Sequence, residues 1–290
     1  MTDHPSARTS RVAVLGTGLI GAAVARNLAR KSFDVRAWNR TSDKAKVLLA
    51  DGVSVHDTAS EAVRDADIIV TVLKDGAAVS EAIGAAQPGI AKGTVWLQLS
   101  TVGVGSIGTL SAFAEENGLV FYDAPVQGTR QPAEQGKLVI LASGPENERP
   151  LAQSVFDAIG QRTLWISEKP GASSRLKLAL NAYVFALTHG TAETLAIAKA
   201  LGIDPALVIE AVTGGPLDSG YFQGKAAAIL RSDYTTSFSV DNGLKDARLV
   251  VDALAGTAIH IDLAAASLAR FQRAADAGHG GKDIAASFLA

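Results

Sequence analysis

The sequence predicts an α/β fold, in which a doubly wound, mostly parallel sheet is followed by a second domain built only of helices. Short β-branched stretches alternate with helical patterns over the first part of the chain, and a glycine-rich turn joins the first strand to the first helix. From residue 204 onward only helical periodicity remains. The 290 residues suffice for about two domains, and we predict them at 1–168 and 169–290.

Apolar periodicity and turn residues predict the individual elements. The predicted strands lie at residues 11–15, 34–38, 67–72, 94–99, 119–122, 138–142 and 163–165. The predicted shorter helices include residues 19–31, 103–117, 205–212, 240–255 and 263–277. A long helix at about 173–201 begins at a cap on Ser173 or Ser174 and ends at Gly202. It would reach roughly 43 Å, so we expect it to link the two domains.

Composition excludes several classes of protein. A net charge of -2 without a basic block argues against nucleic acid as a partner. No stretch approaches the run of about 18 apolar residues that a membrane span needs, and residues 1–10 lack the apolar core of a signal peptide, so we expect a frayed N-terminus and a cytoplasmic protein. The chain has no cysteine, and its five histidines show no metal-ligand spacing, so no metal site is expected.

The first strand ends at a turn with the spacing Gly-x-Gly-x-x-Gly. Gly16, Gly18 and Gly21 follow the strand and open the helix. Such glycines permit a tight turn, a close approach to a pyrophosphate and close helix packing. An ordinary glycine turn is the alternative, but the context favours dinucleotide binding. The turn residues assigned to the cofactor are Gly16, Thr17, Gly18, Leu19, Ile20 and Gly21.

The end of the second strand favours NADP(H) over NAD(H). An NAD site normally carries an acid there, whereas this strand continues into Asn39, Arg40 and Thr41, with Lys44 beyond. Arg40 can bond a 2′-phosphate and stack on adenine, and Asp34 lies at the wrong end of the strand. A solvated basic turn is the alternative. Further residues assigned to the cofactor are Leu73, Lys74, Thr101 and Lys245.

Lys177 and Asn181 are the candidate catalytic residues. They stand four apart on the long helix and therefore project from one face. A shielded lysine donates a proton to a carbonyl oxygen if its pKa falls from about 10.4 through burial or neighbouring cations such as Lys245. A solvated or snorkelling lysine is the alternative.

Nearly the whole chain resembles the β-hydroxyacid dehydrogenase family. The shared motifs, in order, are Gly-Thr-Gly-Leu-Ile-Gly at 16–21, Trp-Asn-Arg-Thr at 38–41, Leu-Ser-Thr-Val at 99–102, Asp-Ala-Pro-Val at 123–126, the segment 132–142, Lys177 with Asn181, Lys245 with Asp246, and Gly-His-Gly at 278–280 with Asp283. The Asn-Arg-Thr turn and the Pro-Ala-Glu segment at 132–134 are most similar to the glyoxylate and succinic semialdehyde reductase branch.

The resemblance implies a Rossmann domain, a helical domain like the C-terminal part of 6-phosphogluconate dehydrogenase, and a cleft between them. It implies Lys177 as general acid, Asn181 beside it, a small carbonyl substrate and a homodimer or homotetramer. The chain departs from the family at 127, where a glutamine replaces the usual serine, so we expect a different preferred substrate. The residues assigned to the substrate are Thr101, Gln127, Gly128, Thr129, Phe222 and Lys245.

Two other functions stay open at this point. Imine reductases share this architecture and the Asn-Arg-Thr turn, although they generally lack the lysine. Some family relatives keep the fold without the lysine and serve as binding modules, and Lys177 argues against that reading.

Overall fold

The computed structural model describes residues 9–290. The expected frayed N-terminus lies largely outside the described residues. The chain divides into two compact units, the first ending at Lys177 and the second beginning at Leu178. This division falls inside helix α8 (Ala172–Ala200), and the domain boundary expected at 168/169 stays a prediction.

The first unit is built on one sheet. Its strands run in the order β3-β2-β1-β4-β5-β6-β8-β7, and β9 pairs with β8. The strands from β3 to β6 are parallel, whereas β8 is antiparallel to β6 and β7. Their bounds are β1 Arg11–Leu15, β2 Asp34–Trp38, β3 Ser54–Val55, β4 Ile68–Thr71, β5 Val95–Gln98, β6 Val120–Asp123, β7 Val126–Gln127, β8 Leu138–Ser143 and β9 Gly160–Ser167.

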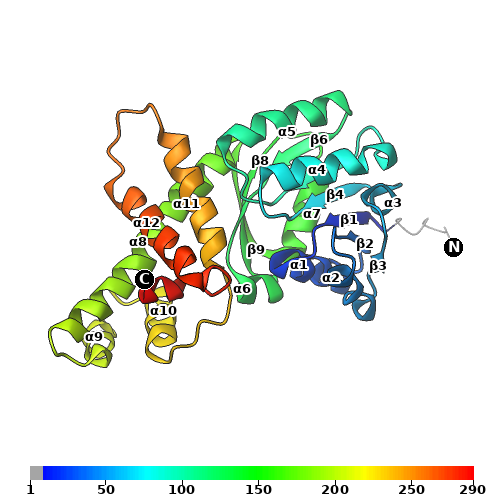
Figure 1. Ribbon diagram of the computed structural model, residues 1–290. Helices are drawn as coiled ribbons and strands as arrows, with labels where there is room; N and C mark the ends of the chain where they lie inside the picture. Colours follow the sequence, from blue (N-terminus) through cyan, green and yellow to red (C-terminus); the bar gives the residue numbers. More distant parts are fainter. Residues whose placement is uncertain (1–8) are drawn as a thin grey trace. The chain divides into compact units, whose positions relative to one another are not determined.

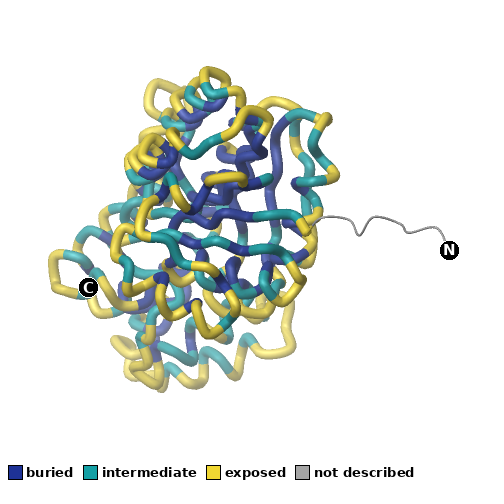
Figure 2. Tube along the Cα trace, turned by 90° about the vertical axis from the view of Figure 1, so that its right-hand side faces the viewer, coloured by how far each residue is buried: buried dark blue, intermediate teal, exposed yellow. Residues whose placement is uncertain are grey.

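Helices cover both faces of this sheet (Figure 1). Their bounds are α1 Leu19–Arg30, α2 Asp43–Lys46, α3 Ala59–Val63, α4 Gly76–Ala86, α5 Val104–Glu116, α6 Arg130–Glu134 and α7 Arg149–Ile159. Alternate strand residues point to opposite faces, so the unit has two apolar layers. One joins α1, α6 and α7 to the sheet and the other joins α3, α4 and α5 to it. Figure 2 shows buried stretches of the chain, in dark blue, enclosed by exposed ones in yellow.

The strand register brings several loops to one edge of the sheet. Leu15 lies beside Trp38 and Thr71, and Thr71 lies beside Gln98. Gln98 in turn lies beside Asp123. The loops that follow β1, β2, β4, β5 and β6 therefore leave the sheet at the same carboxyl edge, where doubly wound sheets bind their ligands.

The second unit is helical. It contains most of α8, from Leu178 onward. Its other helices are α9 Pro205–Val212, α10 Gly220–Leu230, α11 Val240–Leu254, α12 Asp262–Ala274 and a short C-terminal helix Ile284–Leu289. Its apolar core gathers around Phe185, Val240 and Phe271. The Asp283 carboxylate ties the C-terminal segment to Lys225 at 2.5 Å and to the Ser237 hydroxyl at 2.6 Å.

The structure confirms the α/β class, the parallel sheet and the helical second part that the sequence predicts. Gly202 ends α8 in the left-handed conformation, with φ at 77°, as expected. The predicted cap of α8 is wrong, because the helix begins at Ala172 and both Ser173 and Ser174 lie inside its first turn. Within residues 9–290, no helix combines the length and the apolar character that crossing a membrane requires.

Candidate functional site

The glycine turn after β1 is closely packed at two of its three glycines. Gly16 has φ at 101°, and a Cβ there would overlap the carbonyl oxygen of Val72. A Cβ on Gly21 would overlap the carbonyl oxygen of Gly16. Gly18, in contrast, is exposed and has open space where a Cβ would stand. The turn therefore packs closely on the strand side and leaves room at Gly18 for a ligand.

Helix α1 begins directly behind this open glycine. Gly18 is its N-cap, no side chain caps it, and its first turn carries no acid. The amide groups and the positive end of the helix dipole are thus available to an anion. The Thr17 hydroxyl is buried without a hydrogen-bond partner among the described residues. These features fit the pyrophosphate of a dinucleotide, which would accept hydrogen bonds from this turn.

The loop after β2 is tied to the glycine turn by Asn39. Its side-chain oxygen accepts from the Thr17 amide at 3.1 Å, and its amide group donates to the Thr41 carbonyl at 2.9 Å. Arg40 is 78% exposed and lies 3.6 Å from the Glu81 carboxylate, which is also exposed. Thr41 and Lys44 are exposed as well. The basic side chains assigned to the 2′-phosphate are accessible to a ligand.

The loops after β4 and β5 are held together by a buried serine. Ser100 Oγ accepts from the Leu73 amide at 2.8 Å, and the Ser100 amide donates to the Gln98 side chain at 2.7 Å. Leu73 is partly buried, Lys74 is exposed and Thr101 is partly buried. All three follow strands that end at the carboxyl edge, where the sequence places them.

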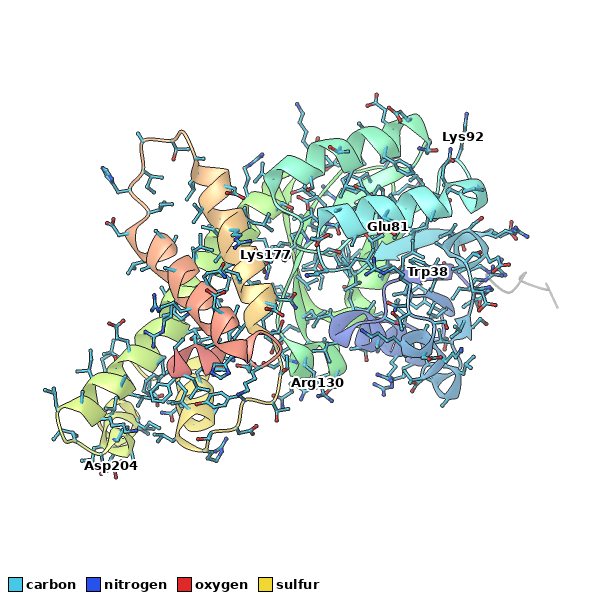
Figure 3. All side chains as sticks on the ribbon, viewed as in Figure 1. Trp38, Glu81, Lys92, Arg130, Lys177 and Asp204 are labelled. Atoms are coloured by element: carbon cyan, nitrogen blue, oxygen red, sulfur yellow. The ribbon has the colours of Figure 1, made fainter. Side chains whose placement is uncertain are left out.

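Lys177 is buried, although it is a lysine on a helix. The residue is only 8% exposed. Its Nζ donates a long hydrogen bond of 3.5 Å to the side-chain oxygen of Gln127, Oε1. Gln127 ends β7, which the sequence did not predict. Gly128 follows with φ at 126°, and Thr129 is the partly buried N-cap of α6. Lys177 is labelled in Figure 3. Within the first unit, a hydrogen bond therefore connects the predicted catalytic residue Lys177 with the predicted substrate residue Gln127.

The first turn of α8 is fastened to the sheet by two buried side chains. Asp123, at the end of β6, accepts from the amides of Gly171 and Ser174 at 3.0 and 2.9 Å and from the Ser174 hydroxyl at 2.8 Å. Ser143, at the end of β8, lies 2.6 Å from the Ser173 hydroxyl, oxygen to oxygen. Burial raises the pKa of Asp123, and the three donated hydrogen bonds oppose that rise.

A second polar cluster lies in the helical unit. Asn181 Nδ2 donates to Asp246 Oδ2 at 2.9 Å, and both residues are buried. Lys245 Nζ lies 2.6 Å from Asp246 Oδ1. The sequence did not assign Asp246 to the site. Its position on α11 indicates that it is buried, because it falls on the same face of the helix as the buried Gly243 and Val250.

Phe222 lies in the apolar core of the helical unit. It packs against a cluster that includes Ala192, Leu195 and Ile229. Its assignment to the substrate stays a prediction. Within residues 9–290, no three His, Cys, Asp or Glu side chains are grouped so as to hold a metal ion.

Two family models together match almost the whole chain. The NAD-binding domain of 6-phosphogluconate dehydrogenase matches residues 11–167. The NAD-binding domain of NADP-dependent 3-hydroxyisobutyrate dehydrogenase matches residues 171–289.

Individual relatives agree with these matches. Glyoxylate/succinic semialdehyde reductase 2 of Arabidopsis thaliana is 28% identical, with 96% of this chain and 78% of the relative covered. A 3-hydroxyisobutyrate dehydrogenase of Salmonella typhimurium shares the structure with a TM-score of 0.88 at 27% identity, with 97% of this chain and 99% of that one covered. An imine reductase of Myxococcus stipitatus, at 24% identity and a TM-score of 0.66 over 97% of this chain and 100% of that one, shares the fold. The chain is an NAD(P)-dependent oxidoreductase and belongs to the β-hydroxyacid dehydrogenase family.

Proposed function

We propose that the protein uses NADPH to reduce a small aldehyde or keto acid, or NADP⁺ to oxidise the corresponding hydroxy compound, with Lys177 as the general acid or base. The observation that carries this proposal is the burial of Lys177, whose ammonium has the Gln127 amide oxygen as a partner. A buried ammonium is costly unless a function or a partner retains it. Lys177 follows a helix turn that is fastened to the carboxyl edge of the sheet.

The chemistry divides between the cofactor and the chain. The bound nicotinamide supplies or accepts the hydride. Lys177 Nζ donates a proton to the carbonyl oxygen during reduction and takes it back during oxidation. The glycine turn holds the pyrophosphate, and Arg40 with Thr41 and Lys44 holds the 2′-phosphate, which is why NADPH is preferred over NADH.

The remaining assigned residues surround the substrate or the nicotinamide in this proposal. Asn181 supplies an amide beside the lysine, and its hydrogen bond to Asp246 sets its orientation. Gln127 places an amide where a serine is usual, so it occupies more space and offers both a donor and an acceptor. The other residues proposed for this role are Leu73, Lys74, Thr101, Gly128, Thr129, Phe222 and Lys245.

The names of the relatives and the side chain at residue 127 support the proposed substrate class. Relatives are named for glyoxylate, succinic semialdehyde and 3-hydroxyisobutyrate, which are small compounds that combine a carboxylate with an aldehyde or a hydroxyl group. The larger Gln127 side chain favours a different member of this class from the one that a serine favours.

A panel of substrates tests the proposal. NADPH oxidation is followed by absorbance with glyoxylate, succinic semialdehyde, further small aldehydes and keto acids, and a cyclic imine, and the same panel is repeated with NADH. Turnover of a carbonyl compound with NADPH above NADH supports the proposal. Turnover of the imine alone, or NADPH binding with no turnover of any compound, would instead identify an imine reductase or a binding module.

We further propose that the protein forms a homodimer or homotetramer through its helical unit. Helix α9 has the apolar sequence Pro-Ala-Leu-Val-Ile-Glu-Ala-Val, yet none of its residues is buried in the single chain. Exposed apolar side chains precede this helix at Ile197, Leu201 and Ile203, and Leu207 is an exposed apolar residue of α9 itself. Contiguous exposed apolar surface is typical of subunit interfaces.

A further inference from the structure

The start of α8 depends on an acceptor that comes from elsewhere in the chain. The first amide groups of a helix need acceptors, which a serine or aspartate just before the helix normally provides. The residue before Ala172 is Gly171, which has no side chain. The carboxylate of Asp123, 51 residues away from Ser174, takes this place instead and accepts from the amides of Gly171 and Ser174 and from the Ser174 hydroxyl.

A second contact fixes the same turn from another strand. The Ser173 amide donates to Ser143 Oγ at 3.1 Å, and the two hydroxyl oxygens are 2.6 Å apart. Because Asp123 ends β6 and Ser143 ends β8, the first turn of α8 is held at two points that the sheet itself spaces. Two such points fix both the advance of the helix along its axis and its rotation about that axis.

Lys177 lies one turn after these contacts. It stands three residues after Ser174 and four after Ser173, so all three side chains share one side of the helix. A helix turn that shifts by one residue carries a side chain about 1.5 Å along the axis and about 100° around it. The hydrogen bond of Lys177 Nζ to Gln127 Oε1 is already 3.5 Å long, and such a shift would break it.

We infer that Asp123 is a positioning residue that places the Lys177 ammonium beside Gln127 by capping α8, with Ser143 as its partner in this role. This inference rests on the proposed function only where it concerns turnover. Asp123 is fully buried and all three of its hydrogen bonds go to the helix start. Asp123 therefore affects the reaction by positioning Lys177, and not by contacting the substrate.

The first test measures the position of Lys177 without any turnover. Full-length protein is acetylated with a limiting amount of acetic anhydride, and mass spectrometry compares Lys177 with the exposed Lys169. In Asp123→Ala the relative labelling of Lys177 rises by roughly tenfold or more, because the ammonium leaves its buried place. Asp123→Asn keeps an acceptor for the two amides and restores most of the protection. Unchanged labelling of Lys177 in Asp123→Ala overturns the inference.

Two further variants guard against a general loss of structure. Tyr122→Phe removes a hydrogen bond of 2.8 Å to the Pro145 carbonyl from the neighbouring residue of β6, and it leaves the labelling of Lys177 unchanged. Ser174→Ala removes one hydrogen bond of Asp123 and keeps the other two, so a folded protein with an intermediate rise in labelling is expected. Equal labelling changes in Tyr122→Phe and Ser174→Ala count against a specific role of Asp123.

A double-mutant cycle then tests the link to catalysis. Asp123→Ala lowers turnover by roughly 10- to 100-fold at an unchanged KM for NADPH, but it lowers the residual turnover of Lys177→Ala no further. Losses that multiply show that Asp123 acts independently of Lys177 and overturn the inference. Full turnover in Lys177→Ala refutes the proposed function instead, and the labelling result still decides whether Asp123 places the lysine.

Discussion

Asn181 and Asp246 form a buried hydrogen bond in the helical unit, with 2.9 Å between the amide nitrogen and the carboxylate oxygen. The Asn181 amide donates to an Asp246 carboxylate oxygen, which would otherwise be buried without a hydrogen bond at a cost in folding free energy. Lys245 neutralises the other oxygen of the same carboxylate at 2.6 Å. The cluster is therefore sensitive to any change that removes the donor or adds a charge.

Asn181→Asp is expected to destabilise the protein in a pH-dependent way. Two carboxylates that face each other raise the pKa of the pair, and a group with a raised pKa stabilises the folded state only below that pKa. The loss in the free energy of unfolding is therefore larger at pH 7 than at pH 5, as measured by urea unfolding. Asn181→Ala loses the hydrogen bond without adding charge, so its cost of about 1–3 kcal/mol stays nearly constant. Equal pH dependence in both variants contradicts this account.

Arg40→Ala is expected to weaken NADPH binding by roughly 10- to 100-fold, which is the effect of losing charge-assisted hydrogen bonds to a phosphate. NADH lacks the 2′-phosphate, so its binding changes little. Glu81→Gln serves as a control, because the exposed pair of Arg40 with Glu81 contributes little by itself. Fluorescence titration with both cofactors measures the effect. Parallel losses for NADPH and NADH would refute the assignment of the 2′-phosphate site.

His189 is expected to make stability fall between pH 7 and pH 5. Burial, together with the positive charges of Arg270 and Arg273, lowers the pKa of His189 to about 3. Its folded pKa lies below the unfolded value near 6.5, so the unfolded state binds the proton first and stability is lost as the pH falls below that value. The expected loss from pH 7 to pH 5 is about 2 kcal/mol.

The variant His189→Phe removes this contribution. Phenylalanine keeps an aromatic contact with Phe271, whose ring centroid lies 4.4 Å from that of His189. Chemical unfolding at both pH values then gives a smaller difference than in the wild type. The exposed His260, changed to glutamine, is the matched control and leaves the pH dependence as it is. A wild-type slope in His189→Phe shows that another group is responsible.

Leu207→Glu is expected to disrupt the proposed oligomer. The leucine is 52% exposed in the single chain and lies on α9, so a charge there opposes burial against a second copy. Light scattering after size-exclusion chromatography should show a shift toward the monomer mass. Val47→Glu introduces the same charge at an exposed apolar residue of the first unit and should leave the mass unchanged. A monomeric wild-type protein contradicts the proposal outright.

The elements that the sequence predicts well are those with local signals. The glycine turn follows directly after the apolar residues 12–15, and α8 stops just before Gly202, where glycine adopts a φ of 77° without strain. The absence of an acid after β2 is also local, since it concerns residues 39–41. Periodicity and turn residues suffice for features of this kind.

The features that the sequence did not predict depend on distant residues. Serines at the start of α8 suggested a local cap, but the acceptor is Asp123, 51 residues before Ser174. The strand β7 has only two residues and forms because β8 pairs with it. Two residues are too few to show the alternation of apolar and polar side chains that predicts a strand. Helix α4 was missed for a different, local reason: although Asp75 caps it, the helix begins with a glycine and is rich in alanine, so its apolar periodicity is weak.

The most direct test of the account is the turnover of Lys177→Ala with NADPH binding measured on the same protein. Removal of a general acid lowers the rate by roughly 10²- to 10⁴-fold, whereas the dissociation constant of NADPH stays at the wild-type value. The exposed Lys169, changed to alanine, is the matched control and retains full turnover. A Lys177→Ala protein that reduces its best carbonyl substrate at the wild-type rate would contradict the role of Lys177 as the general acid.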